Sequence, residues 1–111
     1  MNMNIETHGA VCVVTVHEDR LDAHNSGELK SELNRLFEAG NKSVLVELTD
    51  VRFIDSSGLG VLVSGFKSAS TRQGSFKLCG LQNQVRSMFE LTRLHRVFDI
   101  YATVNEALES W

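Results

Sequence analysis

The residues with the clearest chemical potential form the run Asp55-Ser56-Ser57-Gly58, between an apolar segment and a glycine-containing one. The apolar segment predicts a strand and the next one a helix, so the run lies at a strand-to-helix turn. The two serines can cap free backbone N–H groups there, while Gly58 and Gly60 leave those groups unshielded. A phosphate on an exposed serine would meet N–H donors and the positive end of the helix dipole. Taken alone, the four residues fit a plain helix cap better than a modification site.

Two glycine patterns near this turn resemble nucleotide-binding loops and are incomplete. Gly58-Leu59-Gly60 opens a helix as a dinucleotide fingerprint would, but Val63 stands where the third glycine is required. Residues 60–68 nearly form a P-loop, yet Phe66 takes the place of the lysine. The helical periodicity of residues 61–63 also disfavours a phosphate-cradling loop. We therefore expect no nucleotide cofactor, and no cofactor of another kind.

The histidines and carboxylates lack the spacing of a metal or catalytic site. Glu18, Asp19 and Asp22 cluster without the pattern of a calcium loop. The four histidines show no paired spacing and are interpreted as surface or loop residues: His8, His17, His24 and His95. The sequence therefore predicts no metal site.

A local basic region precedes the C-terminal segment. It consists of Arg86, Arg93, His95 and Arg96. We interpret it as a solvated helix face and loop, with a minor role toward an acidic partner as the alternative.

Composition limits the class of protein. The chain has 111 residues, of which 42% are apolar and 23% charged, and its net charge is -3, typical of one globular domain without affinity for nucleic acid or anionic lipid. Its longest apolar run, Val11 to Val16, is too short for a membrane span, and the N-terminus does not resemble a secretion signal. Cys12 and Cys79 are expected to be buried, reduced thiols, so we predict a cytoplasmic protein.

Strand and helix patterns alternate along the chain. Strands are predicted over residues 5–7, 10–16, 44–48, 51–54, 76–79 and 97–101, the first two joined by a turn at His8-Gly9. Helices are predicted from an Asn25 cap to Gly40, from Leu59 to Gly74, around Val85–Phe89, and from a Thr103 cap with Leu108 and Trp111 on its apolar side. This order predicts an α/β fold: a mixed, mostly parallel β-sheet of about four to five strands covered by about four α-helices.

The segment from Leu48 to Leu62, which contains the Asp-Ser-Ser-Gly run, resembles the signature segment of STAS-domain anti-sigma factor antagonists. The likeness continues in Arg20-Leu21-Asp22, which precedes the first predicted helix. It extends through the C-terminal half, from Gly80 to Phe98 and over residues 103–108. Because the likeness covers nearly the whole chain, residues 1–111 are identified as one STAS domain.

The resemblance implies a phospho-switched regulatory protein that is not an enzyme. Unphosphorylated antagonists of this family bind an anti-sigma factor, usually a serine kinase, and so release the sigma factor. That kinase phosphorylates the serine after the aspartate, and a PP2C-type phosphatase reverses the modification. The phosphoacceptor then corresponds to Ser56. The partner-binding positions correspond to Asp55, Ser57, Gly58 and Leu59, with Asp22 and His24 in a second region of looser likeness.

Two other functions fit the same sequence. The domain could be a scaffold subunit of a stressosome-like or lipid-transport complex, in which Ser56 matters little. It could also be a small enzyme with an unrecognised site. A scaffold would hold stoichiometric partners whatever the state of Ser56, whereas an enzyme would turn over substrate as the isolated chain. Neither nucleic acid binding nor membrane insertion is expected.

Overall fold

A five-stranded mixed sheet organises the chain, and the computed structural model describes all 111 residues. The strands lie in the order β1-β2-β4-β6-β7. Their bounds are β1 Met3–His8, β2 Val11–Val16, β4 Ser43–Glu47, β6 Ser75–Cys79 and β7 Asp99–Tyr101. β1 and β2 form an antiparallel hairpin, and the other three pairings are parallel. The predicted mixed, mostly parallel sheet is confirmed.

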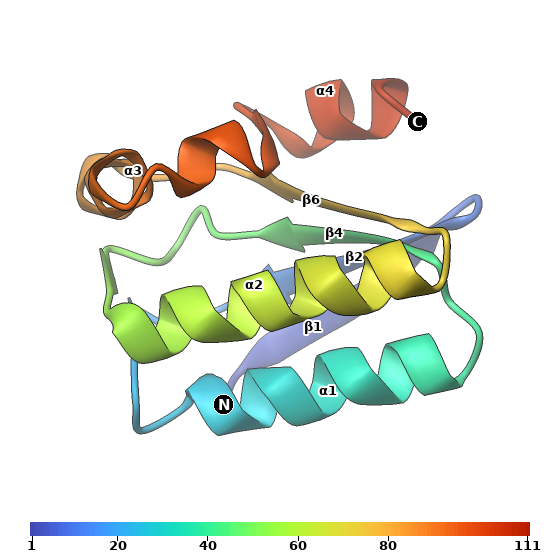
Figure 1. Ribbon diagram of the computed structural model, residues 1–111, viewed down its shortest axis with the longest axis horizontal. Coiled ribbons are helices and arrows are strands. Elements are labelled where there is room, and N and C mark those ends of the chain that lie inside the picture. The colour runs from blue at the N-terminus through green and yellow to red at the C-terminus, as the bar shows by residue number, and fades with distance from the viewer.

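Four α-helices cover the sheet, as predicted. They are α1 Ser26–Glu38, α2 Ser56–Thr71, α3 Asn83–Leu91 and α4 Val104–Glu109, with a short 3-10 helix, η1, at Leu94–Arg96. In Figure 1, α1 and α2 lie side by side below the strands and α4 lies above them. Both faces of the central strands are therefore covered, which explains why Val11–Val16 reads as an almost continuous apolar run.

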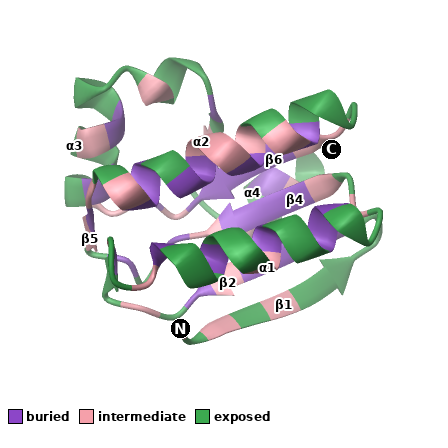
Figure 2. Cartoon of the chain, turned by 60° about the horizontal axis from the view of Figure 1, so that its bottom comes forward, coloured by how far each residue is buried: buried purple, intermediate pink, exposed green.

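The core has two parts on opposite faces of the sheet. The larger part lies between the sheet and helices α1, α2 and α3, and includes Val14, Leu33 and Leu62. The smaller part lies under α4 and consists of Val11, Val13, Leu45, Cys79 and Ala107. Figure 2 shows that burial is concentrated in the central strands and in the helix faces toward them, whereas β1 remains largely exposed.

A second, two-stranded parallel sheet stands apart from the main one. Its strands are β3 (Arg20–Leu21) and β5 (Phe53–Ile54). The predicted strand 51–54 is thus shorter than expected and does not join the main sheet. The chain turns directly after β4, and the backbone N–H groups of Arg52 and Phe53 donate to the carbonyl of Asp19. This small sheet joins the segment before α1 to the segment before α2.

Several predicted element ends need correction. Asn25 precedes α1 but does not cap it: its carboxamide accepts from the N–H of Asp22 at 3.0 Å and donates to the carbonyl of Arg20 at 2.7 Å. α2 ends at Thr71, three residues before Gly74. The last strand begins at Asp99, because residues 94–96 form η1. α4 buries Ala107 rather than Trp111, whose exposed fraction is 37%.

The two cysteines are free and buried, as predicted. Cys12 belongs to the larger part of the core and Cys79 to the smaller, so the sheet separates the two thiols. Burial raises the pKa of the Cys79 thiol to about 12, with a further contribution from the nearby Glu47 carboxylate. As for the membrane, none of the helices combines the length and apolar character that a span would require.

Candidate functional site

The first turn of α2 is capped by Asp55. Its backbone is extended, and its Oδ1 accepts hydrogen bonds from the N–H groups of Ser57 at 2.9 Å and Gly58 at 3.1 Å. The expectation that the serines act as caps is therefore wrong. Ser56 and Ser57 are the first two residues of α2 itself. The free N–H groups of the first turn face Asp55, the residue before the helix, and Asp55 accepts their hydrogen bonds.

The same carboxylate joins α2 to the loop that precedes α1. Asp55 Oδ2 accepts from the N–H of Ala23 at 3.3 Å, and the Asp55 N–H donates to the carbonyl of Leu21 at 3.3 Å. The loop is closed on itself, since Asp22 Oδ1 accepts from the N–H of His24 at 3.0 Å. Two regions separated by about thirty residues in the sequence are therefore adjacent in the structure, and they contain Ser56 and the candidate residues Asp22 and His24.

Ser56 is the exposed residue of this turn. It is the first residue of α2, and its neighbour Ser57 is half-buried with its N–H held by Asp55. Because Asp55 supplies the cap, the Ser56 hydroxyl is free for other chemistry. The carboxylate of Asp55 adjoins Ser56 in the chain. In the loop that Asp55 holds, Arg20 Nε lies 3.4 Å from Asp22 Oδ2.

Gly58 serves a different purpose from the one predicted. A Cβ at this position would lie 2.6 Å from the carbonyl oxygen of Leu21 and 2.7 Å from Cγ1 of Ile54. Glycine is therefore needed because β3 and β5 approach the first turn of α2 closely. Leu59 points into the core, with 5% of its surface exposed. Gly58 and Leu59 thus position the turn and present almost no surface to a partner.

Comparison with known proteins decides the family. The profile of the STAS domain matches residues 2–107. The chain belongs to the STAS domain family. The anti-sigma-B factor antagonist of Bacillus subtilis is 32% identical over 103 residues, which make up 92% of this STAS domain and 94% of that protein. A Thermotoga neapolitana relative is 41% identical over 70 residues, and this match spans 63% of the chain and 62% of the relative's length.

Solved structures agree with the family assignment. An anti-sigma-factor antagonist (STAS) domain protein from Planctomyces limnophilus superposes on this STAS domain with a TM-score of 0.87 and 27% identity. The superposition covers 97% of this chain and 96% of that one. The family and the fold predicted from the sequence are thereby confirmed.

The structure also places the other candidate residues of this STAS domain. His8 Nε2 lies 3.2 Å from a Glu6 carboxylate oxygen, and His17 Nδ1 lies 2.9 Å from Asp50 Oδ2. No three histidine, cysteine, aspartate or glutamate side chains are grouped so that they could hold a metal ion.

Two residues that support the turn were not predicted from the sequence. Gln84 of α3 accepts from the N–H of Ile54 through Oε1 at 3.2 Å, which fixes the end of β5. The guanidinium carbon of Arg20 lies 4.2 Å from the centre of the Phe53 ring. Both contacts join segments about thirty residues apart, so no local pattern could have shown them.

Proposed function

We propose that this STAS domain is an anti-sigma factor antagonist that binds its partner through the surface around Ser56 and loses it when Ser56 is phosphorylated. The observation that carries the proposal is the exposed Ser56 hydroxyl at the start of a helix whose cap is already supplied by Asp55. The name of the Bacillus subtilis relative supports the antagonist function. The domain then acts by binding, with no catalysis and no cofactor of its own, in the cytoplasm.

The binding surface in this proposal combines two regions. Ser56 and Ser57 supply the start of α2, and Asp22 and His24 supply the loop that Asp55 holds beside it. Gly58 and Leu59 contribute by setting the position of the turn. The partner is an anti-sigma factor that is also a serine kinase, and a PP2C-type phosphatase removes the phosphate.

Electrostatics explains how the modification acts without unfolding the domain. A phosphate adds about -1.5 to -2 charges, which the positive end of α2 favours by about 0.3–1 kcal/mol. The adjacent carboxylate of Asp55 repels the phosphate by a comparable, solvent-screened amount, whereas the charge of Asp22 is paired with Arg20. These opposing effects nearly cancel, so the fold is retained. A docked partner must instead desolvate the phosphate, and a hundredfold loss of affinity requires only about 2.7 kcal/mol.

Phosphorylation by the partner kinase with ATP tests the proposal. We expect one phosphate, located on Ser56 by peptide mass mapping. The Ser56→Ala variant should stay bound to the kinase in the presence of ATP, while the matched Ser57→Ala variant should be phosphorylated and released. A phosphate found mainly on Ser57, Ser26 or Ser64 would refute the site.

Physical measurements on the phosphorylated form test the mechanism. Its circular dichroism should be unchanged and its melting temperature should lie within a few degrees of that of the unmodified domain. Unfolding on phosphorylation would contradict the electrostatic argument. Partner binding that ignores phosphorylation would indicate a scaffold, and turnover by the isolated chain would indicate an enzyme.

A further inference from the structure

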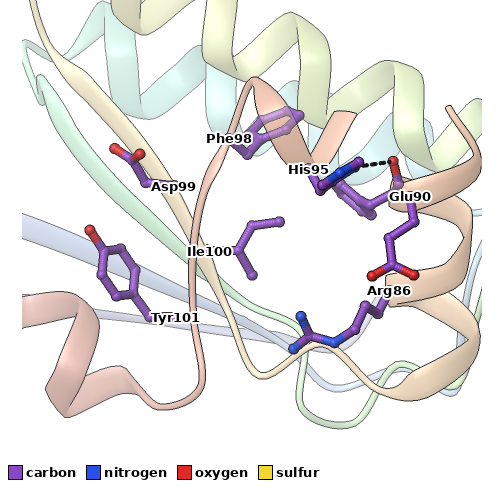
Figure 3. A pocket seen from close by; sticks show the side chains of 8 residues that line it. Arg86, Glu90, His95, Phe98, Asp99, Ile100 and Tyr101 are labelled. Atoms are coloured by element: carbon purple, nitrogen blue, oxygen red, sulfur yellow. Dashed lines mark hydrogen bonds between the residues drawn. The ribbon is translucent and has the colours of Figure 1, made fainter. Parts of the chain in front are cut away.

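A groove of about 380 Å³ lies between α3, η1 and the edge strand β7. Figure 3 shows Ile100 pointing toward Arg86 of α3, whereas Asp99 and Tyr101 lie on the other side of the strand. Successive residues of a strand face opposite sides of the sheet, and here residues from both sides line the same groove. The groove therefore follows the open edge of β7 rather than one face of the sheet.

The backbone of β7 is open along this groove. β7 is the last strand of the sheet, and its one neighbour is β6, whose Cys79 pairs with Tyr101. The carbonyl of Tyr101 accepts from the N–H of Gly80 at 3.0 Å, so Tyr101 directs its backbone groups toward β6. In a parallel ladder each residue directs its N–H and C=O to the side opposite from those of its neighbours in the strand. The N–H and C=O of Ile100 thus face the groove, where an added strand could pair with them.

The charges around the groove favour an acidic ligand. Arg86, Arg93 and Arg96 are exposed, and none of them forms an ion pair in this structure. The groove itself contains two carboxylates, Glu90 and Asp99. Arg86 lines the groove, and Arg93 and Arg96 are near its lining residues in the sequence, so in this region three guanidinium groups outnumber two carboxylates on a chain whose net charge is -3.

Backbone strain is found in the same region. Arg93 has a φ of +61°, in the left-handed conformation that glycine adopts with less strain. An arginine is nevertheless found there, directly before η1. Arg93 follows the C-cap of α3, and Gln73 takes the same position after α2 with a φ of +59°, so this conformation ends the helix and leaves the Arg93 side chain exposed.

Apolar surface accompanies the arginines. Two of the three exposed large hydrophobic side chains lie here, Leu91 with 79% and Val97 with 47% of its surface exposed. The groove itself has four apolar or aromatic lining residues. Two of them, Phe89 and Phe98, are buried, so its accessible apolar surface comes from Ile100 and Tyr101. Arginine beside exposed apolar groups is the composition found in the centre of protein interfaces.

The opposite edge of the sheet, formed by β1, has a hollow of a different kind from the groove beside β7. A second hollow, near β1, is lined by Asn4, Glu6 and His8, which all lie on the same face of that strand. Its carboxylates are already paired within the chain, as Glu6 is with His8 and Asp50 with His17. That hollow lies on the sheet face. β1 is also an edge strand with one unpaired backbone side, but no groove follows that side.

We propose that the β7 edge docks an extended, acidic segment of a partner protein, which pairs with Ile100 as an added strand. An apolar side chain of that segment would contact Ile100, which is half-buried, and a carboxylate would approach the exposed Arg86. This surface shares no residue with the proposed Ser56 site, so the proposal stands whether or not Ser56 is a switch.

A titration followed by NMR tests the proposal on the full chain. The probe is a blocked peptide, acetyl-Thr-Val-Thr-Glu-Thr-Val-amide, which presents valine and glutamate on one face of a strand. We expect shifts concentrated on the amides of Ile100 and its neighbours. The same peptide with lysine in place of glutamate should bind more weakly.

Chemical variants of the probe isolate strand pairing. One peptide is N-methylated at the threonines and another at the valines and glutamate, so each lacks the N–H groups on one side of the strand. Strand addition predicts that one of them loses binding and the other retains it. Equal binding by both, or shifts centred on the Ser56 turn or on β1, would overturn the proposal.

Charge reversal in the protein isolates the electrostatic part. Arg86→Glu should weaken peptide binding by about fivefold, whereas Lys30→Glu, an equal charge change on the exposed side of α1, should alter it by less than about twofold. Circular dichroism checks that both variants are folded. Equal effects of the two substitutions would refute a specific contact. Stronger shifts of the same amides with RNA or with phosphatidylglycerol vesicles would overturn the assignment of a protein segment.

Discussion

Substitution of the two glycines at the start of α2 should have opposite effects on stability. In Gly58→Ala the new methyl group would lie 2.6 Å from the carbonyl oxygen of Leu21 and 2.7 Å from Cγ1 of Ile54. In Gly60→Ala the new methyl group would meet no atom within 4 Å. The two positions lie two residues apart in one helix, so each variant is a matched control for the other.

The expected magnitudes follow from two effects. Alanine is favoured over glycine inside a helix by about 0.5–1 kcal/mol, which applies to both positions. Forcing a methyl group into closely packed surroundings costs about 1–3 kcal/mol, which applies to position 58 alone. At Gly58 the obstacle includes a backbone carbonyl of β3, which cannot rotate away as a side chain could. We expect Gly58→Ala to lower the free energy of unfolding by about 1–2 kcal/mol and Gly60→Ala to raise it by about 0.5–1 kcal/mol.

Urea denaturation of the three proteins measures these differences. An unchanged slope with denaturant would confirm that stability itself has changed. Because Gly58 faces β3, its substitution should also move the loop of Asp22 and His24 and weaken partner binding under the proposed function. If Gly58→Ala were as stable as Gly60→Ala, the close approach of β3 to α2 would be wrong.

Three further predictions concern other parts of the molecule. Asp55→Ala should lower the free energy of unfolding by about 1–2 kcal/mol in urea denaturation, because the N–H groups that Asp55 caps lose their acceptor, whereas Asp55→Asn should lose less. Lys77 is buried, and its ammonium donates to Ser110 Oγ at 2.8 Å, so Lys77→Met should speed amide hydrogen exchange in α4 and leave α1 unaffected. The pKa of the Cys79 thiol rises from an ordinary 9.0 to about 12, so the unfolded chain releases this proton first as pH rises. Stability should therefore fall from about pH 9 toward 12, by up to about 1.4 kcal/mol per pH unit, and Cys79→Ala should reduce this slope in denaturation curves.

The sequence by itself determined the features that depend on neighbouring residues. The apolar run Val11–Val16 predicted a buried strand, and Gly40, with a φ of +98°, ends α1 as expected. Thr103 caps α4 by accepting from the N–H of Glu106 at 3.1 Å. Each of these features involves residues within a few positions of one another, so the local pattern carries the information. The Asp-Ser-Ser-Gly run likewise marked the start of α2 and the family.

The tertiary structure decided which of several locally acceptable polar groups forms each contact. Asp55, Ser56 and Ser57 are all suitable caps, and the choice of Asp55 depends on where α2 begins and on the Ala23 N–H that reaches its second oxygen. Asn25 is a good cap by type, yet its carboxamide closes the loop before α1. The pairing of β3 with β5 likewise brings together segments about thirty residues apart. Such contacts depend on the distance between segments in space, which pairing and packing of the whole chain set and no short stretch of sequence encodes.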